Sequence, residues 1–275
     1  CYSNDLRIHI FCIKEMNFGD ILIYSVPPLA LTSIYLLLVR KKTDYIEKIS
    51  IALLSVQSLS LIMLISFFYT TNLEYKYVSD YSSTDLNLFY KFSGLWAGRD
   101  GTLLIWTWSA TLFMILERKF NPTNDRQKEL TTAICCLLIF GLSLIQLYIN
   151  PFRTNDVIPI EGNGLNPLLL SPYMIVHPPI VFVSYGMIIL LYASGMAYLI
   201  TGNKNWNETI KRWGRASWIG MSLALILGGY WAYVTLGWGG YWAWDPVETA
   251  GLLPWLSMTT LLHTSVTVSY THLRA

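Results

Sequence analysis

Long apolar runs separated by short polar segments make up most of the chain. A helix needs about 20 residues, most of them apolar, to cross the hydrocarbon core of a bilayer. Seven runs are that long or nearly so, and each predicts a transmembrane helix. The runs are residues 20–39, 49–69, 102–116, 132–149, 179–201, 214–236 and 249–268. This pattern predicts an all-α fold, a polytopic transmembrane helix bundle of about seven spans.

The connections between these runs alternate in charge. The first, third and fifth connections hold four Lys or Arg residues each, and the second, fourth and sixth hold three, one and none. In chain order they are residues 40–48, 70–101, 117–131, 150–178, 202–217 and 237–248. Because basic loops stay on the cytoplasmic side, we expect the N-terminus and the three less basic connections on the outer side of the membrane.

The composition agrees with a membrane protein. Hydrophobic residues make up 53% of the chain and charged residues 13%, which is about half the charged share of a typical soluble domain. The net charge is +2 and no block of five or more basic residues occurs, so we expect membrane lipid and no nucleic acid as a partner. The four cysteines form no CxxC pair. Cys135 and Cys136 lie inside an apolar run, where we expect them to serve packing.

The two ends of the sequence differ from the rest. Met16 directly precedes the first apolar run, so residues 1–15 are interpreted as lying upstream of the natural start. Residues 269–275 follow the last run without a polar tail and are interpreted as read-through. We therefore expect one membrane domain over residues 16–268, and we discount His9 and His272, which lie in the end segments.

An aromatic loop between the sixth and seventh runs is the densest chemical signal. It reads Trp238-Gly239-Gly240-Tyr241-Trp242-Ala243-Trp244-Asp245-Pro246-Val247-Glu248. Gly239 and Gly240 permit positive φ and a close approach of a partner. The indoles of Trp238, Trp242 and Trp244 offer a stacking surface to a large planar ligand, and a porphyrin fits that description at a bilayer surface. We expect an external Trp-rich loop that binds haem; the alternative is interfacial anchoring by aromatic side chains.

The same loop ends in a pattern typical of a helix start. Asp245 is the expected N-cap, Pro246 the first helical residue, and Glu248 completes a variant of the capping box. The sequence leaves open whether Asp245 and Glu248 only cap the helix or also contact a ligand.

Two of the four histidines lie within the expected membrane domain. His177 heads His177-Pro178-Pro179 before the fifth run, where two prolines fit the first turn of a helix and fix the direction of the chain. A rigidly held imidazole on the outer side suits axial ligation of haem iron. The alternative is a histidine that caps the helix.

His263 lies deep in the seventh run. An ionisable residue within a span predicts a functional role, and three roles are open to it: haem ligand, proton relay or polar contact between helices. No second histidine lies within the predicted spans, so a six-coordinate haem there would need a ligand from elsewhere.

The loop Trp238–Glu248 resembles the WWD signature of a superfamily of haem-handling proteins. Within it, further segments resemble the CcmF family, the haem lyase subunit of the system for cytochrome c-type biogenesis. These segments are Phe92–Trp106, Leu165–Leu169 and His177–Pro179. The resemblance runs from about Met16 to about Val268 and implies the N-terminal part of a longer CcmF-like protein. Arg99-Asp100-Gly101 departs from the family, which often has His-Glu-Gly there.

The resemblance implies roles for individual residues. His177 is similar to the first external axial ligand of haem iron, and His263 to the first transmembrane ligand of a stable haem b. The second ligand of each would come from later spans. Haem is then a substrate at the external loop, and no catalytic residue is assignable. The remaining haem contacts would be Trp238, Gly239, Gly240, Trp242, Trp244 and Asp245.

The resemblance also implies an activity, that of a holocytochrome c synthase (haem lyase) subunit. The haem chaperone CcmE would bring haem to the loop, and CcmH-type thiol proteins would deliver apocytochrome c, whose CxxCH thiols add across the haem vinyl groups. This chemistry needs reduced iron and close positioning more than acid–base catalysis. The implied location is the cytoplasmic (inner) membrane, with the N-terminus and the Trp-rich loop on the periplasmic side.

Two other functions are kept open. The first is a haem exporter of the same superfamily that attaches nothing; Asn166–Leu169 and His177–Pro179 favour the lyase over it. The second is a respiratory-complex subunit or ion transporter without haem. Such a protein would place several charged residues within its spans, and the predicted spans contain almost none.

Overall fold

The computed structural model describes residues 16–40, 44–121, 126–202, 206–237 and 239–272, with the side chains of 266–272 left out. Residues 1–15, which the sequence sets apart from the membrane domain, lie outside the described residues. Over the described part the chain is helical, and its one β-type pairing is an isolated bridge between Tyr75 and Thr154. The predicted all-α class is confirmed for these residues.

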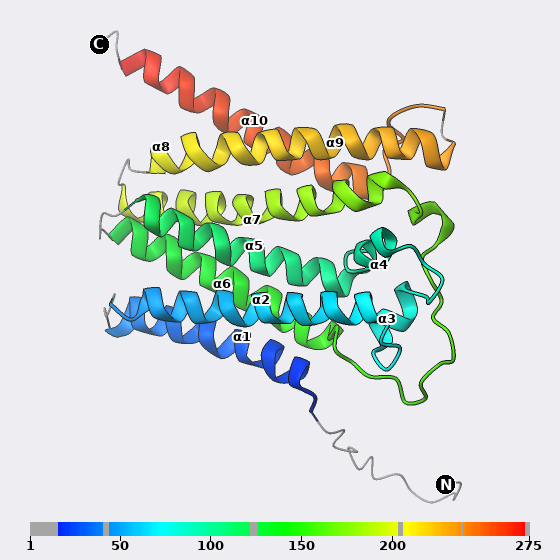
Figure 1. Ribbon diagram of the computed structural model, residues 1–275. Coiled ribbons are helices and arrows are strands. Elements are labelled where there is room, and N and C mark those ends of the chain that lie inside the picture. The colour runs from blue at the N-terminus through cyan, green and yellow to red at the C-terminus, as the bar shows by residue number, and fades with distance from the viewer. Residues whose placement is uncertain (1–15, 41–43, 122–125, 203–205, 238, 273–275) are drawn as a thin grey trace, which may run out of the picture.

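The long helices run side by side in alternating directions (Figure 1). They are α1 (Phe18–Tyr35, extended by the π-helix η1, Leu36–Arg40), α2 (Ile46–Thr70), α5 (Arg99–Phe120), α6 (Arg126–Ile149), α7 (Pro172–Thr201), α9 (Arg215–Leu236) and α10 (Pro246–His272). The core of each predicted apolar run lies in one of them. α7 packs against α5, α6 and α9, whereas α10 packs on α9 at the margin. The central position of α7 matters because this helix carries His177.

Five helical stretches are long and apolar enough to cross a membrane by length and composition, within the described residues. They are Phe18–Arg40, Ile46–Thr70, Arg126–Ile149, Pro172–Thr201 and Trp206–Leu236. α5 and α10 are not among them, although both are long, because Trp, Thr and Ser residues dilute their apolar segments. The prediction of about seven spans is thus supported for five.

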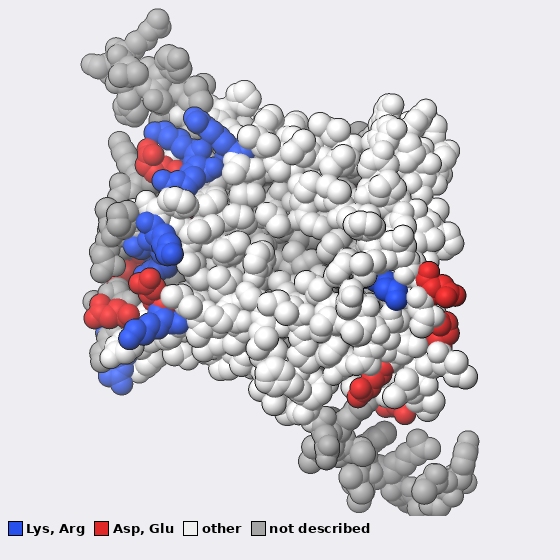
Figure 2. Space-filling view, in the orientation of Figure 1, with Lys and Arg blue, Asp and Glu red and all other residues white. Residues whose placement is uncertain are grey.

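In the view of Figure 2 charged side chains gather at the two ends of the bundle, and the surface between them carries no charged residue. At one end, here called the basic end, α5 and α7 finish and α6 and α9 begin; most Lys and Arg in this view lie there. The other end, here called the loop end, holds the short helices α3 (Lys76–Tyr81) and α4 (Leu88–Gly94), the 3-10 helix η2 (Pro167–Leu169) and the start of α10. The alternation of basic and less basic connections is therefore reproduced in space.

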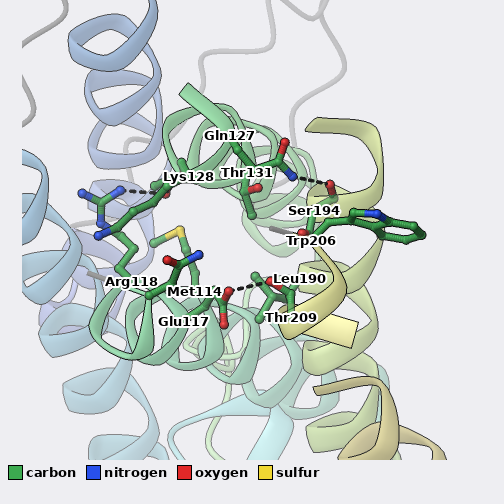
Figure 3. A pocket seen from close by; sticks show the side chains of 12 residues that line it. Met114, Glu117, Arg118, Gln127, Lys128, Thr131, Leu190, Ser194, Trp206 and Thr209 are labelled. Atoms are coloured by element: carbon green, nitrogen blue, oxygen red, sulfur yellow. Dashed lines mark hydrogen bonds between the residues drawn. The ribbon is translucent and has the colours of Figure 1, made fainter. Parts of the chain in front are cut away.

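The basic end is closed by a buried carboxylate. Glu117 of α5 is 6% exposed. It accepts hydrogen bonds from Thr209 Oγ1 at 2.6 Å and Trp213 Nε1 at 2.7 Å, and Arg212 NH1 lies 3.4 Å from it. These partners belong to α8 (Trp206–Thr209) and the π-helix η3 (Ile210–Gly214). Beside them remains a cavity of about 10 Å³ (Figure 3), which is about the size of one water molecule.

The centre of the bundle is apolar and tightly packed. Cys135 and Cys136 are fully buried in the main core cluster, together with residues of α5 and α7. Cys136 Sγ lies 3.7 Å from Met114 Sδ. The prediction that these two cysteines serve packing is confirmed.

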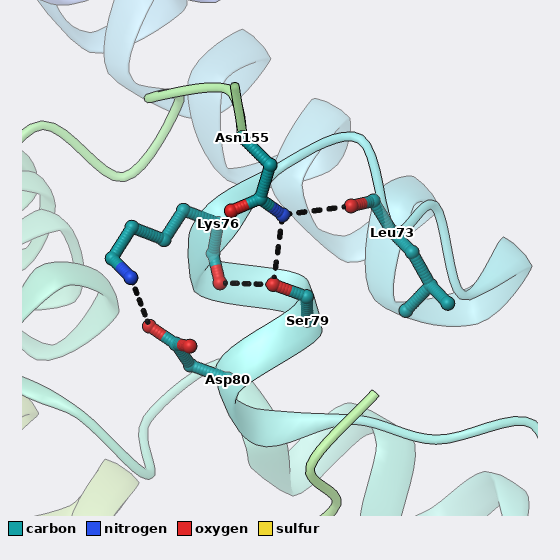
Figure 4. Close-up of polar contacts among 5 residues, drawn as sticks. All are labelled: Leu73, Lys76, Ser79, Asp80 and Asn155. Atoms are coloured by element: carbon teal, nitrogen blue, oxygen red, sulfur yellow. Dashed lines mark hydrogen bonds and ion pairs between the residues drawn. The ribbon is translucent and has the colours of Figure 1, made fainter. Parts of the chain in front are cut away.

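The second connection, which the sequence suggests as a loop, contains α3 and α4. Asn155 ties α3 to the fourth connection, because its Nδ2 donates to Leu73 O and to Ser79 Oγ, both at 2.9 Å (Figure 4). Tyr77 is 4% exposed and its hydroxyl lies 3.0 Å from Leu95 O. Burial raises the pKa of Tyr77 well above its ordinary value, so the hydroxyl stays protonated and donates. This bond fixes the segment that precedes α5.

Close packing of α5 on α7 gives the first prediction. A Cβ at Gly186 of α7 would lie 2.8 Å from the backbone carbonyl carbon of Ser109 and closer still to Ser109 Oγ, whereas a Cβ at Gly195 meets nothing within 4 Å. Gly186→Ala should therefore lower the thermal stability in detergent, by about 1–3 kcal/mol, because the helices must separate. Gly195→Ala on the same helix is the matched control and should be neutral or slightly stabilising. Equal melting temperatures for the two variants would contradict this packing.

Candidate functional site

A cavity of about 770 Å³ lies at the loop end, between α5, α7, α9 and α10. Sites for small molecules and cofactors commonly measure about 300–1,000 Å³. Its walls are mostly apolar and aromatic, and the ionisable groups in them, besides Tyr185, are Arg99, His177, Asp245 and Glu248. A large apolar cavity with a few convergent polar groups is the usual form of a ligand site.

His177 lies in the second turn of α7, and not at its start as predicted. α7 begins at Pro172 after the N-cap Ser171, whose side chain accepts a hydrogen bond from Tyr173 N at 3.4 Å. A serine N-cap followed by proline is a stronger helix start than His-Pro-Pro, so Pro178 and Pro179 fall inside the helix.

The prolines interrupt the hydrogen bonding of α7 at the turn that carries His177. Pro178 has no N–H and cannot donate to Met174 O, four residues earlier. Trp96 replaces this bond, because its Nε1–H donates to Met174 O at 2.7 Å. Trp96 also lines the cavity. This hydrogen bond joins the segment before α5 directly to the turn of α7 that carries His177.

The imidazole of His177 is held on two sides. Its Nδ1 lies 2.9 Å from Ala224 O, and its ring meets that of Trp231 edge-on, with centroids 5.9 Å apart. Because a carbonyl oxygen only accepts, Nδ1 must carry the proton, and Nε2 keeps its lone pair. A histidine oriented by an Nδ1–H to carbonyl bond is the usual form of a metal ligand. A Cβ at Gly228 would lie 2.8 Å from the ring, so glycine is required there.

The Trp-rich loop contributes one described indole to the cavity. Trp242 lines it, whereas Trp244 is 72% exposed and meets Trp242 edge-on, with interplanar angle 84°. Gly239 has φ +71°, as expected for a turn, but neither Gly239 nor Gly240 lines the cavity. Trp238 lies outside the described residues. The two described indoles of the loop, Trp242 and Trp244, thus do not form one continuous stacking surface. Other aromatic residues of the cavity wall come from other segments: Trp96, Phe182, Tyr185 and Trp231.

Tyr241 holds the loop against α9. Its ring packs on those of Tyr230 and Tyr233, with centroids 6.5 and 4.7 Å apart. A Cβ at Gly229 would lie 2.7 Å from Tyr241 O, so the close approach of loop and helix depends on glycine at this position.

The predicted capping box is present at the start of α10. Glu248 N donates to Asp245 Oδ1 at 2.6 Å, and Glu248 Oε2 accepts from Ala243 N at 2.9 Å and Asp245 N at 3.4 Å. Only one of the two carboxylate oxygens of Glu248, Oε2, takes part in capping. Glu248 Oε1 and Trp242 Nε1 are buried and have no hydrogen-bond partner among the described residues, and both side chains line the cavity. A buried polar atom without a hydrogen-bond partner costs free energy, so such atoms usually have a partner in native proteins.

His263 lies elsewhere. It is 18 residues beyond Asp245 on α10, which diverges from the bundle toward the basic end (Figure 1). Its neighbour Leu262 approaches Gly214 of η3. The side chain of His263 is exposed and is not part of the cavity wall. The structure therefore brings His177, Trp242 and Asp245 together but separates them from His263.

The fold and the cavity define a class: an integral membrane helical bundle with a large apolar cavity at the end that carries the aromatic loop. Residues 96–274 match the family described as Cytochrome C assembly protein. The chain belongs to this family, in its CcmF branch, and the resemblance seen in the motifs is confirmed.

Individual relatives support the same family assignment. The chain is 35% identical over 192 residues to the cytochrome c-type biogenesis protein NrfE of Haemophilus influenzae, covering 68% of this chain and 30% of the relative. It is 35% identical over 211 residues to the cytochrome c-type biogenesis protein CcmF of Escherichia coli K12, covering 74% and 32%. The chain thus spans about a third of the length of these relatives.

A solved structure shares the fold. It is described as Cytochrome c Heme Lyase CcmF and superposes with a TM-score of 0.73 at 23% identity, covering 96% of this chain and 44% of that one.

The bond between Trp96 and Met174 gives the second prediction. Trp96→Phe keeps the aromatic volume but leaves Met174 O unpaired, so stability in detergent should fall by about 1–3 kcal/mol. Trp244→Phe, at an exposed position without a hydrogen bond from its indole to a described residue, is the control and should change little. The check is thermal unfolding of both purified variants. A Trp96→Phe variant as stable as the wild type would show that this bond does not hold α7.

Proposed function

We propose that this chain binds haem in the loop-end cavity and takes part in its covalent attachment to apocytochrome c. The observation that carries the proposal is His177, whose Nδ1 is engaged by Ala224 O and whose Nε2 is left with a lone pair in an apolar cavity of about 770 Å³. The names of the relatives, cytochrome c-type biogenesis proteins, support the same pathway.

The lining fits haem as a substrate. A bound haem needs a wide apolar space, an axial nitrogen for its iron and a few polar groups at its rim. The aromatic walls of the cavity supply the apolar space, and His177 supplies the nitrogen. The unpaired Trp242 Nε1 and Glu248 Oε1 are polar groups that a ligand can engage. Haem supplies the iron and the vinyl groups, while the residues of this chain bind it, orient it and exclude water. Trp238, Gly239, Gly240, Trp244 and Asp245 are the further proposed contacts at the loop.

His263 is proposed as an axial ligand of a second, stable haem b within the membrane. Its exposed position on α10, a helix at the margin of the bundle, suits a haem shared with a helix outside this chain. Such a haem would lie far from the cavity, since 18 residues of helix rise about 27 Å. It would serve electron transfer, not substrate binding.

For the topology we propose seven crossings within one membrane domain, residues 16–268, in the cytoplasmic (inner) membrane. The N-terminus and the loop end would face the periplasm. The concentration of Lys and Arg at the basic end supports this orientation. α5 and α10 would be the two less apolar crossings, and α5 is enclosed by α2, α6 and α7.

The proposed partners meet the chain at the loop end. CcmE would deliver haem and CcmH-type thiol proteins would present apocytochrome c, so that this chain acts as part of a holocytochrome c synthase. This proposal is supported by the position of the cavity and the Trp-rich loop, which lie at the same end of the bundle.

The third prediction tests the iron ligand. In detergent-purified chain titrated with haem, His177→Ala should bind at least about tenfold more weakly, since coordination contributes more than 1.4 kcal/mol, and should lack the absorption spectrum of the ligated iron. Added imidazole should restore that spectrum. Metal-free protoporphyrin is the control, and its affinity should be unchanged.

Gly228→Ala should shift the spectrum as well, because the new methyl group displaces the ring. A His177→Ala variant with the wild-type spectrum would refute ligation. Binding of haem without any attachment to a CxxCH-bearing apocytochrome, in membranes that hold the complete system, would favour a haem exporter.

The fourth prediction concerns His263. A reduced-minus-oxidised spectrum of the full-length protein should show a b-type band that disappears in His263→Ala, while haem binding at the cavity persists. Retention of the whole band in the variant would show that the haem is ligated elsewhere.

A further inference from the structure

Among the described residues that line the cavity, one has a cationic side chain, Arg99. It is the first residue of α5, after the N-cap Gly98, which provides no side-chain cap. The guanidinium of Arg99 makes no hydrogen bond or ion pair with a described residue. By contrast, Lys76 pairs with Asp80 at 3.6 Å and Lys91 donates to Thr71 Oγ1 at 2.7 Å. The charge of Arg99 acts on the neighbouring Asp100 and Tyr81, but its N–H groups are not taken up by a described partner and can bind an anionic group of a ligand.

The acidic groups lie on the opposite side of the cavity. Asp245 and Glu248 belong to α10, and α10 packs on α9, α9 on α7 and α7 on α5. His177 projects from α7, between the cationic and the acidic sides. An asymmetric ligand with carboxylates at one edge is therefore attracted at the α5 side and repelled at the α10 side.

We infer that Arg99 binds a propionate of haem and thereby sets the orientation of the porphyrin in the cavity, with its propionate edge toward α5. This inference rests on the proposed function. A planar guanidinium pairs bidentately with a carboxylate, so it fixes direction as well as position. The opposite edge of the ring then faces Trp242 and the start of α10, which is the side where the Trp-rich loop lies.

The fifth prediction separates this role from a structural one by changing the ligand. Arg99→Gln is titrated with haem and with haem whose two propionates are methyl esters, in the purified chain. Loss of the charge-assisted pair should weaken haem binding roughly ten- to a hundredfold and leave the affinity for the diester unchanged. Arg99→Lys should recover part of the loss. Arg153→Gln is the matched control, because Arg153 lies at the same end but outside the cavity wall, and it should bind both ligands like the wild type.

The outcomes are distinct. Equal weakening for haem and diester would show that Arg99 acts on the structure alone, and no weakening for either would show that the propionates lie elsewhere; both overturn the inference while haem binding stands. A wild-type chain that binds neither ligand would refute the proposed function, and the inference with it.

Discussion

Lipid offers no hydrogen-bond partner to the backbone, so every carbonyl within the bundle must be paired by the protein. This constraint applies to α7, which packs against three neighbouring long helices and contains Pro178 and Pro179. The indole of Trp96 takes the place of the missing donor at Met174 O. One side chain thus allows a proline-containing turn in the central helix, and that turn presents His177 to the cavity.

The two ends of the bundle are built differently. At the basic end Glu117 draws α5, α8 and η3 together and leaves room for about one water molecule. At the loop end α5, α7, α9 and α10 border a cavity of about 770 Å³. The hydrogen bonds of Glu117 hold the helices together at the basic end, while the cavity at the loop end is an open space between them. A preformed cavity lowers the entropy that a protein loses when it binds a ligand.

The length of the apolar runs and the charge of the connections were sufficient to predict the seven long helices and the end of the bundle at which each connection lies, because transfer into lipid and the positive-inside rule act on local sequence. The short helices α3 and α4 were not predicted. The capping box at Asp245 and Glu248 was predictable because it also depends on local sequence. The start of α7 was not, since Ser171-Pro172 and His177-Pro178 are both plausible starts and only one is capped. Trp96 and Trp231 were missed as wall residues because nothing in a sequence without an alignment shows which indoles from distant helices converge.

The separation of the two histidines follows from the same architecture. His177 is half-buried, with its Nδ1 bonded to Ala224 O of α9, whereas His263 is exposed on a helix that leaves the bundle. Two histidines in such different surroundings are unsuited to ligate a single haem, which agrees with the proposal of a substrate haem at His177 and a stable haem at His263. Charged groups of opposite sign line the cavity, with Arg99 on one side and Asp245 and Glu248 on the other. This asymmetry would give a flat, nearly symmetric ligand such as the proposed haem a preferred direction in the cavity.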